Sequence, residues 1–227
     1  MLFPELGARV AAVRERIDAA AERGGHGQKV TIVAVTKTHG PEAVTAALAA
    51  GIGDIGENRV QEALTKMSQV PGAVRWHLIG HLQRNKVRHL EPFTLFHALD
   101  SARLADAVNR FGEERGRPVE VLVQVNPVGE ETKGGFDMRE IEAESVRLAA
   151  MPGLAVRGTM TIARLGAGET ELRETFAAVR RASRVLSSAG HPATELSMGM
   201  SQDFEIAVEE GATMVRLGSI LFGAREQ

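Results

Sequence analysis

A lysine stands at the carboxyl end of a strongly apolar stretch near the start of the chain. The stretch Val30–Lys37 predicts a strand buried on both faces, with Lys37 at its carboxyl end shortly before the turn-forming Gly40 and Pro41. Burial disfavours the charged form of an ammonium group, and the neutral amine is the nucleophile that forms an imine with an aldehyde. A lysine that only extends its charged end from a strand into water would also explain this stretch, so the remaining residues must decide.

Two later stretches have the composition of anion-binding turns. Ser197–Ser201 places small residues before a predicted helix, and Leu217–Ser219 does the same after an apolar strand. Backbone N–H groups and the helix dipole at such turns can hold phosphate without a lysine, although two ordinary capped turns would look the same. Arg216 lies inside the apolar Met214–Leu217 segment, where an arginine that stays charged needs a partner.

The elements that would position these residues alternate regularly. After an amphipathic helix that ends near Gly24 and Gly25, the pattern predicts eight strands, each followed by a helix. Eight such units in 227 residues fit a closed parallel barrel better than an open sheet. We therefore expect an α/β fold, a single-domain (β/α)8 TIM barrel over residues 1–227 with an extra N-terminal helix. The predicted strands are Val30–Lys37, Ile52–Ile55, Val74–Ile79, Phe93–His97, Val119–Val125, one within Leu154–Ile162, Thr194–Met198 and Thr213–Leu217.

Several of the predicted helices begin at recognisable residues. Pro41 starts one, Ser101 caps another, a third covers Asp137–Ala149, and Ser201 or Asp203 caps a fourth. In a barrel of this kind, chemistry collects where strands end and helices begin, so the polar residues at these ends should share one mouth. They are Lys37, Glu57, Asn58, His81, Asp100, Ser101, Asn126, Thr161, Ser197, Ser201, Arg216, Gly218 and Ser219.

Composition and spacing exclude other classes. A formal net charge of −2 argues against a general nucleic-acid or membrane-surface binder, and no apolar run approaches a membrane span, so we expect a cytoplasmic protein. The absence of cysteine excludes disulfides and thiolate chemistry. Gly51–Gly56 fits the dinucleotide-binding pattern G-x-G-x-x-G, which requires a strand before its first glycine. A predicted helix precedes it here, so we interpret the segment as a helix end followed by a strand and predict no dinucleotide site. His77 and His81 do not share a helix face, so we predict no metal site.

Several blocks identify a known family. They run through nearly the whole chain in order, and the chain resembles the YggS/PROSC family of pyridoxal-phosphate homeostasis proteins. The blocks are Val33–Thr38, Gly56–Glu62, Trp76–Lys86, His97–Ser101, Gln124–Asn126, Arg157–Met160, Leu196–Ser201 and Met214–Arg225.

The resemblance implies a barrel like the N-terminal domain of alanine racemase that binds pyridoxal 5′-phosphate (PLP). It implies that Lys37 is the Schiff-base lysine, that Arg216 faces the pyridine nitrogen and that Asn58 lies beside the ring. The phosphate is expected at Ser201, Gly218 and Ser219. The family more often has Thr in place of Ser219, which keeps a hydroxyl, and often Pro in place of His81, whose role stays open.

The family stores, carries or buffers PLP, so we expect a homeostasis protein that delivers PLP to apo PLP-enzymes, acts as a monomer and has no robust catalytic activity. One alternative is a PLP-dependent enzyme acting on amino acids, such as a racemase. The other is an aldolase-type barrel in which Lys37 forms an imine with a sugar aldehyde. An arginine at the ring nitrogen is a poor proton donor, and the chain contains no Tyr for a second catalytic face, so we expect no efficient racemase.

Overall fold

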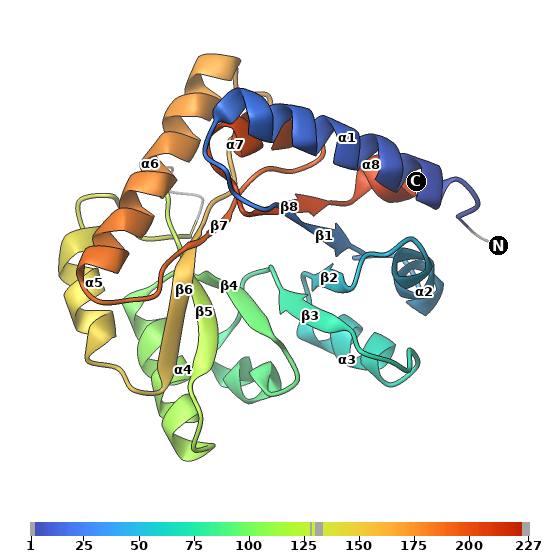
Figure 1. Ribbon diagram of the computed structural model, residues 1–227. Helices are drawn as coiled ribbons and strands as arrows, with labels where there is room; N and C mark the ends of the chain where they lie inside the picture. The colour runs from blue at the N-terminus through green and yellow to red at the C-terminus, as the bar shows by residue number, and fades with distance from the viewer. Residues whose placement is uncertain (1–2, 128, 130–133, 224–227) are drawn as a thin grey trace.

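Eight parallel strands close into a barrel in the order β1 to β8, with β8 pairing back onto β1. The computed structural model describes residues 3–127, 129 and 134–223 (Figure 1), so Ala224 and Arg225 of the last family block lie outside it. The predicted (β/α)8 barrel with an extra N-terminal helix is confirmed. Among the helices of the described residues, none has the length and apolar character needed to span a membrane.

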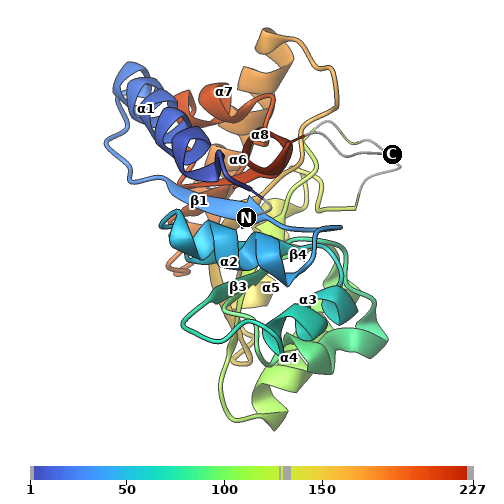
Figure 2. The ribbon, with the colours of Figure 1, turned by 90° about the vertical axis from the view of Figure 1, so that its right-hand side faces the viewer.

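The strands are short, and the helices cover the outside of the barrel. The strands are β1 Thr31–Val35, β2 Asp54–Glu57, β3 Arg75–Leu78, β4 Leu95–Leu99, β5 Val119–Gln124, β6 Leu154–Met160, β7 Glu195–Ser197 and β8 Met214–Leu217. The helices are α1 Leu6–Gly24, α2 Pro41–Ala49, α3 Val60–Met67, the 3-10 helix η1 Arg84–Leu90, α4 Ala102–Glu114, α5 Ile141–Ala149, α6 Glu169–Ser188, α7 Phe204–Glu209 and α8 Ser219–Phe222. Helices α2, α3 and α4 follow one another around one side of the barrel (Figure 2).

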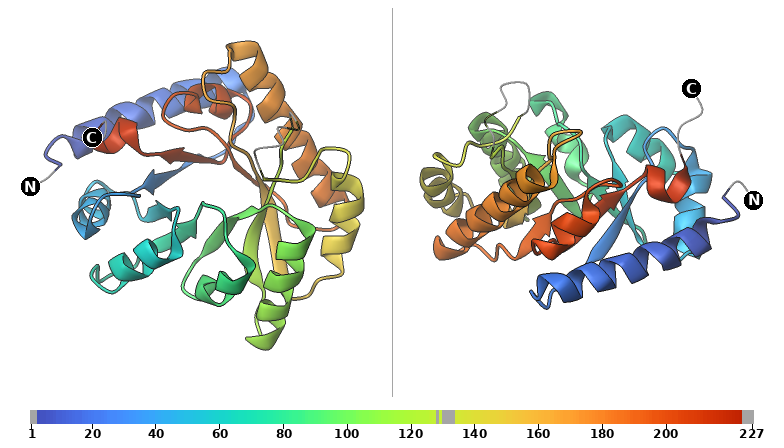
Figure 3. Two further views of the ribbon diagram at one scale, coloured as in Figure 1. Left: turned by 180° about the vertical axis from the view of Figure 1, so that it is seen from behind. Right: turned by 90° about the horizontal axis from the view of Figure 1, so that it is seen from above.

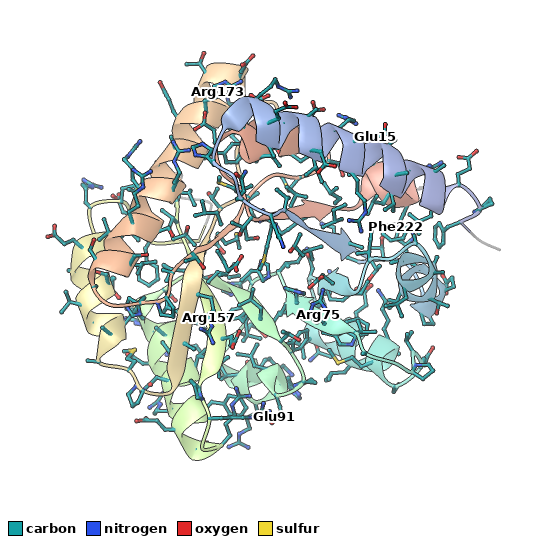
Figure 4. The ribbon with its side chains drawn as sticks, in the orientation of Figure 1. Glu15, Arg75, Glu91, Arg157, Arg173 and Phe222 are labelled. Atoms are coloured by element: carbon teal, nitrogen blue, oxygen red, sulfur yellow. The ribbon has the colours of Figure 1, made fainter. Side chains whose placement is uncertain are left out.

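The extra helix α1 lies against the last part of the barrel. Its buried face carries apolar residues at helical spacing, among them Leu6, Val10, Val13 and Ile17. It packs against α7 and α8, and α7 lies between α1 and α6 (Figure 3). Phe222 of α8 lies close to α1 (Figure 4), with its ring centroid 5.3 Å from that of Phe3. Helix α1 therefore covers the segment that follows β8.

Two strand predictions were displaced along the chain. Strand β2 covers Asp54–Glu57, whereas we expected it to end at Ile55. Pairing with β1 extends it, because Val35 aligns with Gly56 in the barrel register. A Cβ on Gly56 would come within 2.9 Å of the Val33 side chain, so a glycine fits where neighbouring side chains meet in the interior. Strand β4 likewise runs over Leu95–Leu99, later than predicted.

Several helix boundaries also differ from the prediction. Helix α5 begins at Ile141, four residues after the expected Asp137, and η1 is a 3-10 helix. Ser101 and Asp203 occupy the N-cap positions of α4 and α7, but neither makes a side-chain capping hydrogen bond. The helix end predicted at Gly51 is confirmed, since this residue has φ 78° after α2 and precedes β2.

Candidate functional site

A cavity of about 850 Å³ opens at the carboxyl ends of the strands. All six residues predicted for one site line it, although they come from four separate stretches of the chain. They are Lys37, Asn58, Ser201, Arg216, Gly218 and Ser219. The cavity volume lies in the range of about 300–1,000 Å³ that is typical of small-molecule sites.

Lys37 occupies the second position of a tight turn after β1. The N–H of His39 donates to the carbonyl of Thr36 at 3.1 Å, which closes the turn. Thr38, the third residue, has φ 70° and is the one non-glycine residue with positive φ in the described part of the chain. This position in a type II turn normally requires glycine, and a β-branched residue there costs on the order of 1–2 kcal/mol. The turn that carries Lys37 is therefore strained and must be held by its surroundings.

A buried polar group holds this turn from behind. We call Thr36, Glu57, Glu62 and Lys66 the lysine cluster. The Lys66 ammonium donates to the Thr36 carbonyl at 2.8 Å, to Glu57 Oε1 at 2.6 Å and to Glu62 Oε1 at 2.9 Å. Glu62 Oε1 also accepts the N–H of Thr38 at 2.6 Å, so the residues on both sides of Lys37 are anchored to the cluster.

The two carboxylates of the lysine cluster differ in pKa. Burial is the largest influence on Glu57 and raises its pKa, against the lowering effect of Lys66 and Thr36. Its second oxygen, Oε2, is also buried and has no hydrogen-bond partner among the described residues. At Glu62 burial acts in the same direction, but hydrogen bonds from Lys66 and Thr38 outweigh it and lower the pKa. The cluster therefore depends on the Lys66 cation to keep a fully buried carboxylate in place.

Arg216 lies in β8, the strand that pairs with β1, and lines the same cavity as Lys37. Its guanidinium donates from Nη1 to the carbonyl and hydroxyl of Ser197, each at 2.7 Å, and from Nη2 to the Thr161 carbonyl at 2.7 Å. Burial lowers its pKa to about 10, and the charge of Asp203 opposes that shift. An arginine has five N–H donors, so these three contacts fix the group and still let it donate to a ligand.

A chain of hydrogen bonds runs from Arg216 through the barrel interior. We call Ser197, His97, His77 and Asp54 the histidine chain. His97 Nδ1 lies 2.9 Å from the Ser197 hydroxyl, and its Nε2 lies 2.9 Å from His77 Nδ1. His77 Nε2 lies 3.0 Å from Asp54 Oδ1. Asp54 also pairs with Arg75. Arg75 lies at the start of β3 (Figure 4), so the histidine chain joins the cavity side to the opposite end of the barrel.

The two ends of the histidine chain fix its direction when both histidines are neutral. Arg216 can only donate, and ionised Asp54 can only accept. The Ser197 hydroxyl then donates to His97, which donates to His77, which donates to Asp54. Burial lowers the pKa of His97 well below its usual range, with His77 and Arg216 adding to the effect, so His97 is neutral at physiological pH. The histidine chain therefore supports the Arg216 cation without placing a carboxylate against it.

The turns after β7 and β8 meet at Ser201. Its hydroxyl oxygen accepts the N–H groups of Gly218 and Ile220 at 3.4 and 3.3 Å. Gly199 allows the first turn to be this tight, because it has φ 92° and a Cβ there would lie 2.7 Å from the Ala207 Cβ. A hydroxyl and backbone N–H groups thus converge beside the cavity, and phosphate binding at these two turns stays a prediction.

Not all of the polar residues predicted at the strand ends line the cavity. Glu57, Thr161 and Ser197 are buried and do not line the cavity. Their orientation depends on the pleat and register of each strand. His81 stands at the rim with its Nδ1 2.6 Å from Asp100 Oδ2, and both residues line the cavity.

The sequence reasoning missed three contributors. The Arg164–Ala167 segment after β6 lines the cavity, and no motif indicated it. Lys66 and His97 are buried and support the site from behind. Lys66 follows Glu62 by four residues, a spacing that indicates an ion pair on a helix. This spacing does not indicate that Lys66 is buried.

The fold and this cavity define a parallel (β/α)8 barrel with an amine and a buried guanidinium at one mouth. A family model described as alanine racemase, N-terminal domain, matches residues 9–226. The pyridoxal phosphate homeostasis protein of Aquifex aeolicus is 38% identical over 222 residues, covering 96% of this chain and 97% of the relative. The protein of the same name from Escherichia coli is 37% identical over 229 residues, covering 96% and 95%.

A solved structure agrees with these relatives. PipY of Synechococcus elongatus, with PLP bound, has 37% sequence identity and a TM-score of 0.85, covering 96% of this chain and 100% of PipY. The chain belongs to the family of the pyridoxal phosphate homeostasis proteins, whose barrel matches the N-terminal domain of alanine racemase. The resemblance read from the sequence blocks is confirmed.

Proposed function

We propose that this protein binds PLP at the described cavity and serves PLP homeostasis by holding and delivering the cofactor. The observation that carries the proposal is that Lys37, Arg216 and Ser201 line one cavity, although they are distant in the sequence. The names of the relatives and the PLP-bound structure of PipY support the same ligand.

The donor set fits PLP group by group. Lys37 provides an amine for the aldehyde, and bound PLP supplies an electrophilic carbon and a ring that can withdraw electrons. The Ser201 and Ser219 hydroxyls can donate to the phosphate, and the Gly218 N–H, which donates to the Ser201 oxygen at 3.4 Å, lies beside them. Arg216 is a buried cation held by neutral groups, so it can donate to the pyridine nitrogen. Asn58 lines the cavity beside these groups and is assigned to the ring.

Holding and delivery fit this site better than catalysis on amino acids. An acidic partner at the pyridine nitrogen would strengthen electron withdrawal, but Arg216 keeps its proton at neutral pH. We propose that the protein passes the bound PLP itself to apo PLP-enzymes. We also propose that the protein acts as a monomer.

The decisive experiment removes the amine. Lys37→Ala should abolish a borohydride-reducible visible band and leave only weaker binding through the phosphate groups. Lys29→Ala, which removes an exposed lysine upstream of β1, is the matched control and should keep the band. Mass spectrometry after reduction should locate the wild-type adduct on Lys37. An adduct that persists in Lys37→Ala would assign the chemistry to another lysine and contradict the proposal.

Delivery has its own test. Wild-type protein loaded with PLP is mixed with an apo PLP-enzyme and an excess of a trap for free aldehyde. Activation of the enzyme despite the trap is the expected result. Activation that the trap abolishes would show release into solution, which contradicts direct delivery but leaves binding intact.

A further inference from the structure

We propose that Lys66 is a positioning residue for Lys37: it holds the strained turn that presents the Lys37 amine to an aldehyde in the cavity. The inference rests on the proposed function, because it gives the turn a ligand to serve. Lys66 comes from α3, nearly thirty residues away in the chain, and only 3% of its surface is exposed.

The Lys66 ammonium is fully used by this arrangement. Its three hydrogen bonds go to the Thr36 carbonyl, Glu57 and Glu62, which satisfies all three donors of the group. The carbonyl of Thr36 is also the acceptor that closes the turn to His39. One buried cation therefore fixes the atom on which the turn depends.

The anchoring reaches both neighbours of Lys37. Before it, the Thr36 hydroxyl donates to Glu57 Oε1 at 2.5 Å in addition to the contact from Lys66. After it, the Thr38 N–H donates to Glu62, whose same oxygen accepts from Lys66. Thr38 keeps its unfavourable positive φ while these contacts hold the turn. Without them the backbone would relax toward negative φ, which turns the Lys37 side chain to a new direction.

The lysine cluster acts through Lys37 and not on the ligand. Val35, Lys37 and Asn58 line the cavity directly beside cluster residues in the sequence, but Thr36, Glu57, Glu62 and Lys66 themselves do not line it. Removing Lys66 should therefore affect the reaction of the amine and leave binding of the phosphate group unchanged. A merely structural role would affect both.

The test compares two ligands in Lys66→Met and Glu62→Ala. The first probe is PLP, and the readout is the rate at which borohydride traps it on Lys37. The second is pyridoxine 5′-phosphate, which carries an alcohol in place of the aldehyde, and the readout is its equilibrium affinity. We expect trapping to slow by about 10- to 100-fold, as for a reacting group displaced by about an ångström, with pyridoxine 5′-phosphate affinity within about twofold of wild type. Glu62 is about one-quarter exposed, so Glu62→Ala keeps the test available if Lys66→Met does not fold.

Two further variants sharpen the result. Gln61→Ala, an exposed neighbour on the same helix, is the control and should trap PLP at the wild-type rate. Thr38→Gly combined with Glu62→Ala should recover much of the lost rate, because glycine adopts positive φ without strain. Faster amide exchange at Thr38 in Glu62→Ala should accompany the loss, a readout that needs no ligand.

The outcomes separate this inference from the proposed function. Wild-type trapping rates in both Lys66→Met and Glu62→Ala, equal losses for the two ligands, or no rescue by Thr38→Gly would overturn the positioning role. No PLP trapped on Lys37 of the wild-type protein would instead overturn the assignment of Lys37 itself.

Discussion

The Lys37 side chain and the Arg216 side chain line one cavity but are supported in different ways. The lysine cluster behind Lys37 is compact and ionic, with two carboxylates around one buried ammonium. The histidine chain behind Arg216 is extended, and its two central members are a pair of hydrogen-bonded imidazoles. Losing one partner of a buried ion pair leaves an uncompensated charge, whereas losing one member of a neutral hydrogen-bonded pair, such as the two imidazoles, leaves an unsatisfied but uncharged group, which costs less.

This difference suits what each side is expected to hold. The turn with Lys37 is strained at Thr38, and a strong, directional set of charged contacts keeps it in place. Arg216 has to stay cationic and still donate to a ligand, and a neighbouring carboxylate would compete for its donors. Neutral acceptors at Ser197 and Thr161 fix the guanidinium without neutralising its charge.

The largest expected effect tests the ionic side. Lys66→Met should lower the free energy of unfolding by about 3–5 kcal/mol, because it leaves Glu57 as a buried carboxylate without its cation. Urea denaturation followed by circular dichroism measures the change. Lys29→Met is the matched control for loss of an exposed lysine and should shift stability by less than about 0.5 kcal/mol. A similarly small loss in Lys66→Met would mean that the cluster is not the ionic support described here.

The next effect tests the far end of the histidine chain by pH. Hydrogen bonds from His77 and Arg75 outweigh burial, the largest single influence, and lower the pKa of Asp54 from 3.8 to about 2. A carboxylate with a lowered folded-state pKa stabilises the fold above its unfolded pKa, and the contribution, about 2 kcal/mol, is lost as pH falls from 3.8 through 2.

Asp54→Asn should remove that part of the pH dependence of unfolding. Glu57 has the opposite sign: its raised pKa means that protonation favours the fold, so its contribution grows as pH falls through the folded-state value. Urea unfolding measured across the acid range separates the two sides. An unchanged acid slope in Asp54→Asn would show that the histidine chain does not end on an ionised carboxylate.

A smaller effect tests the residues that we assign to the phosphate of PLP. Ser201→Ala should weaken PLP binding by about 0.5–1.5 kcal/mol, the value of one hydrogen bond, or more if the bond is charge-assisted. Unphosphorylated pyridoxal should bind almost as before, because it lacks the phosphate. Titration calorimetry with both ligands measures this, and equal losses for the two would remove Ser201 from the phosphate site.

The last prediction is that the protein does not racemise amino acids. Proton removal and return on opposite faces of a Cα needs two acid–base groups, whereas the cavity offers one amine, Lys37, and one guanidinium, Arg216, that keeps its proton at neutral pH. The chain has no Tyr to act as the second group. Holo-protein with a panel of L-amino acids in deuterated water should show no D-isomer at around 1 per second, an ordinary enzymatic rate. Inversion at that rate would contradict the homeostasis role proposed here.

The sequence by itself determined the repeating architecture and the six lining residues. Hydrophobic periodicity and chain length specified eight strands and helices, because these patterns are local and repeat along the chain. Parallel strands in a barrel share one carboxyl end, so residues after several strands had to meet there. The barrel rule grouped the polar residues at the strand ends, and the resemblance to the family selected Lys37, Asn58, Ser201, Arg216, Gly218 and Ser219 among them, all of which line the cavity.

Only the tertiary structure decided what supports these residues. Glu57 and Asn58 are adjacent in sequence, yet one is buried in the lysine cluster and the other lines the cavity. His97 and Ser197 are hydrogen-bonded across 100 positions of sequence. Such contacts depend on strand register, pleat and barrel closure, which are set by the packing of the whole chain. A local pattern carries no information about them, and for this reason Lys66 and His97 were recognised only in the folded protein.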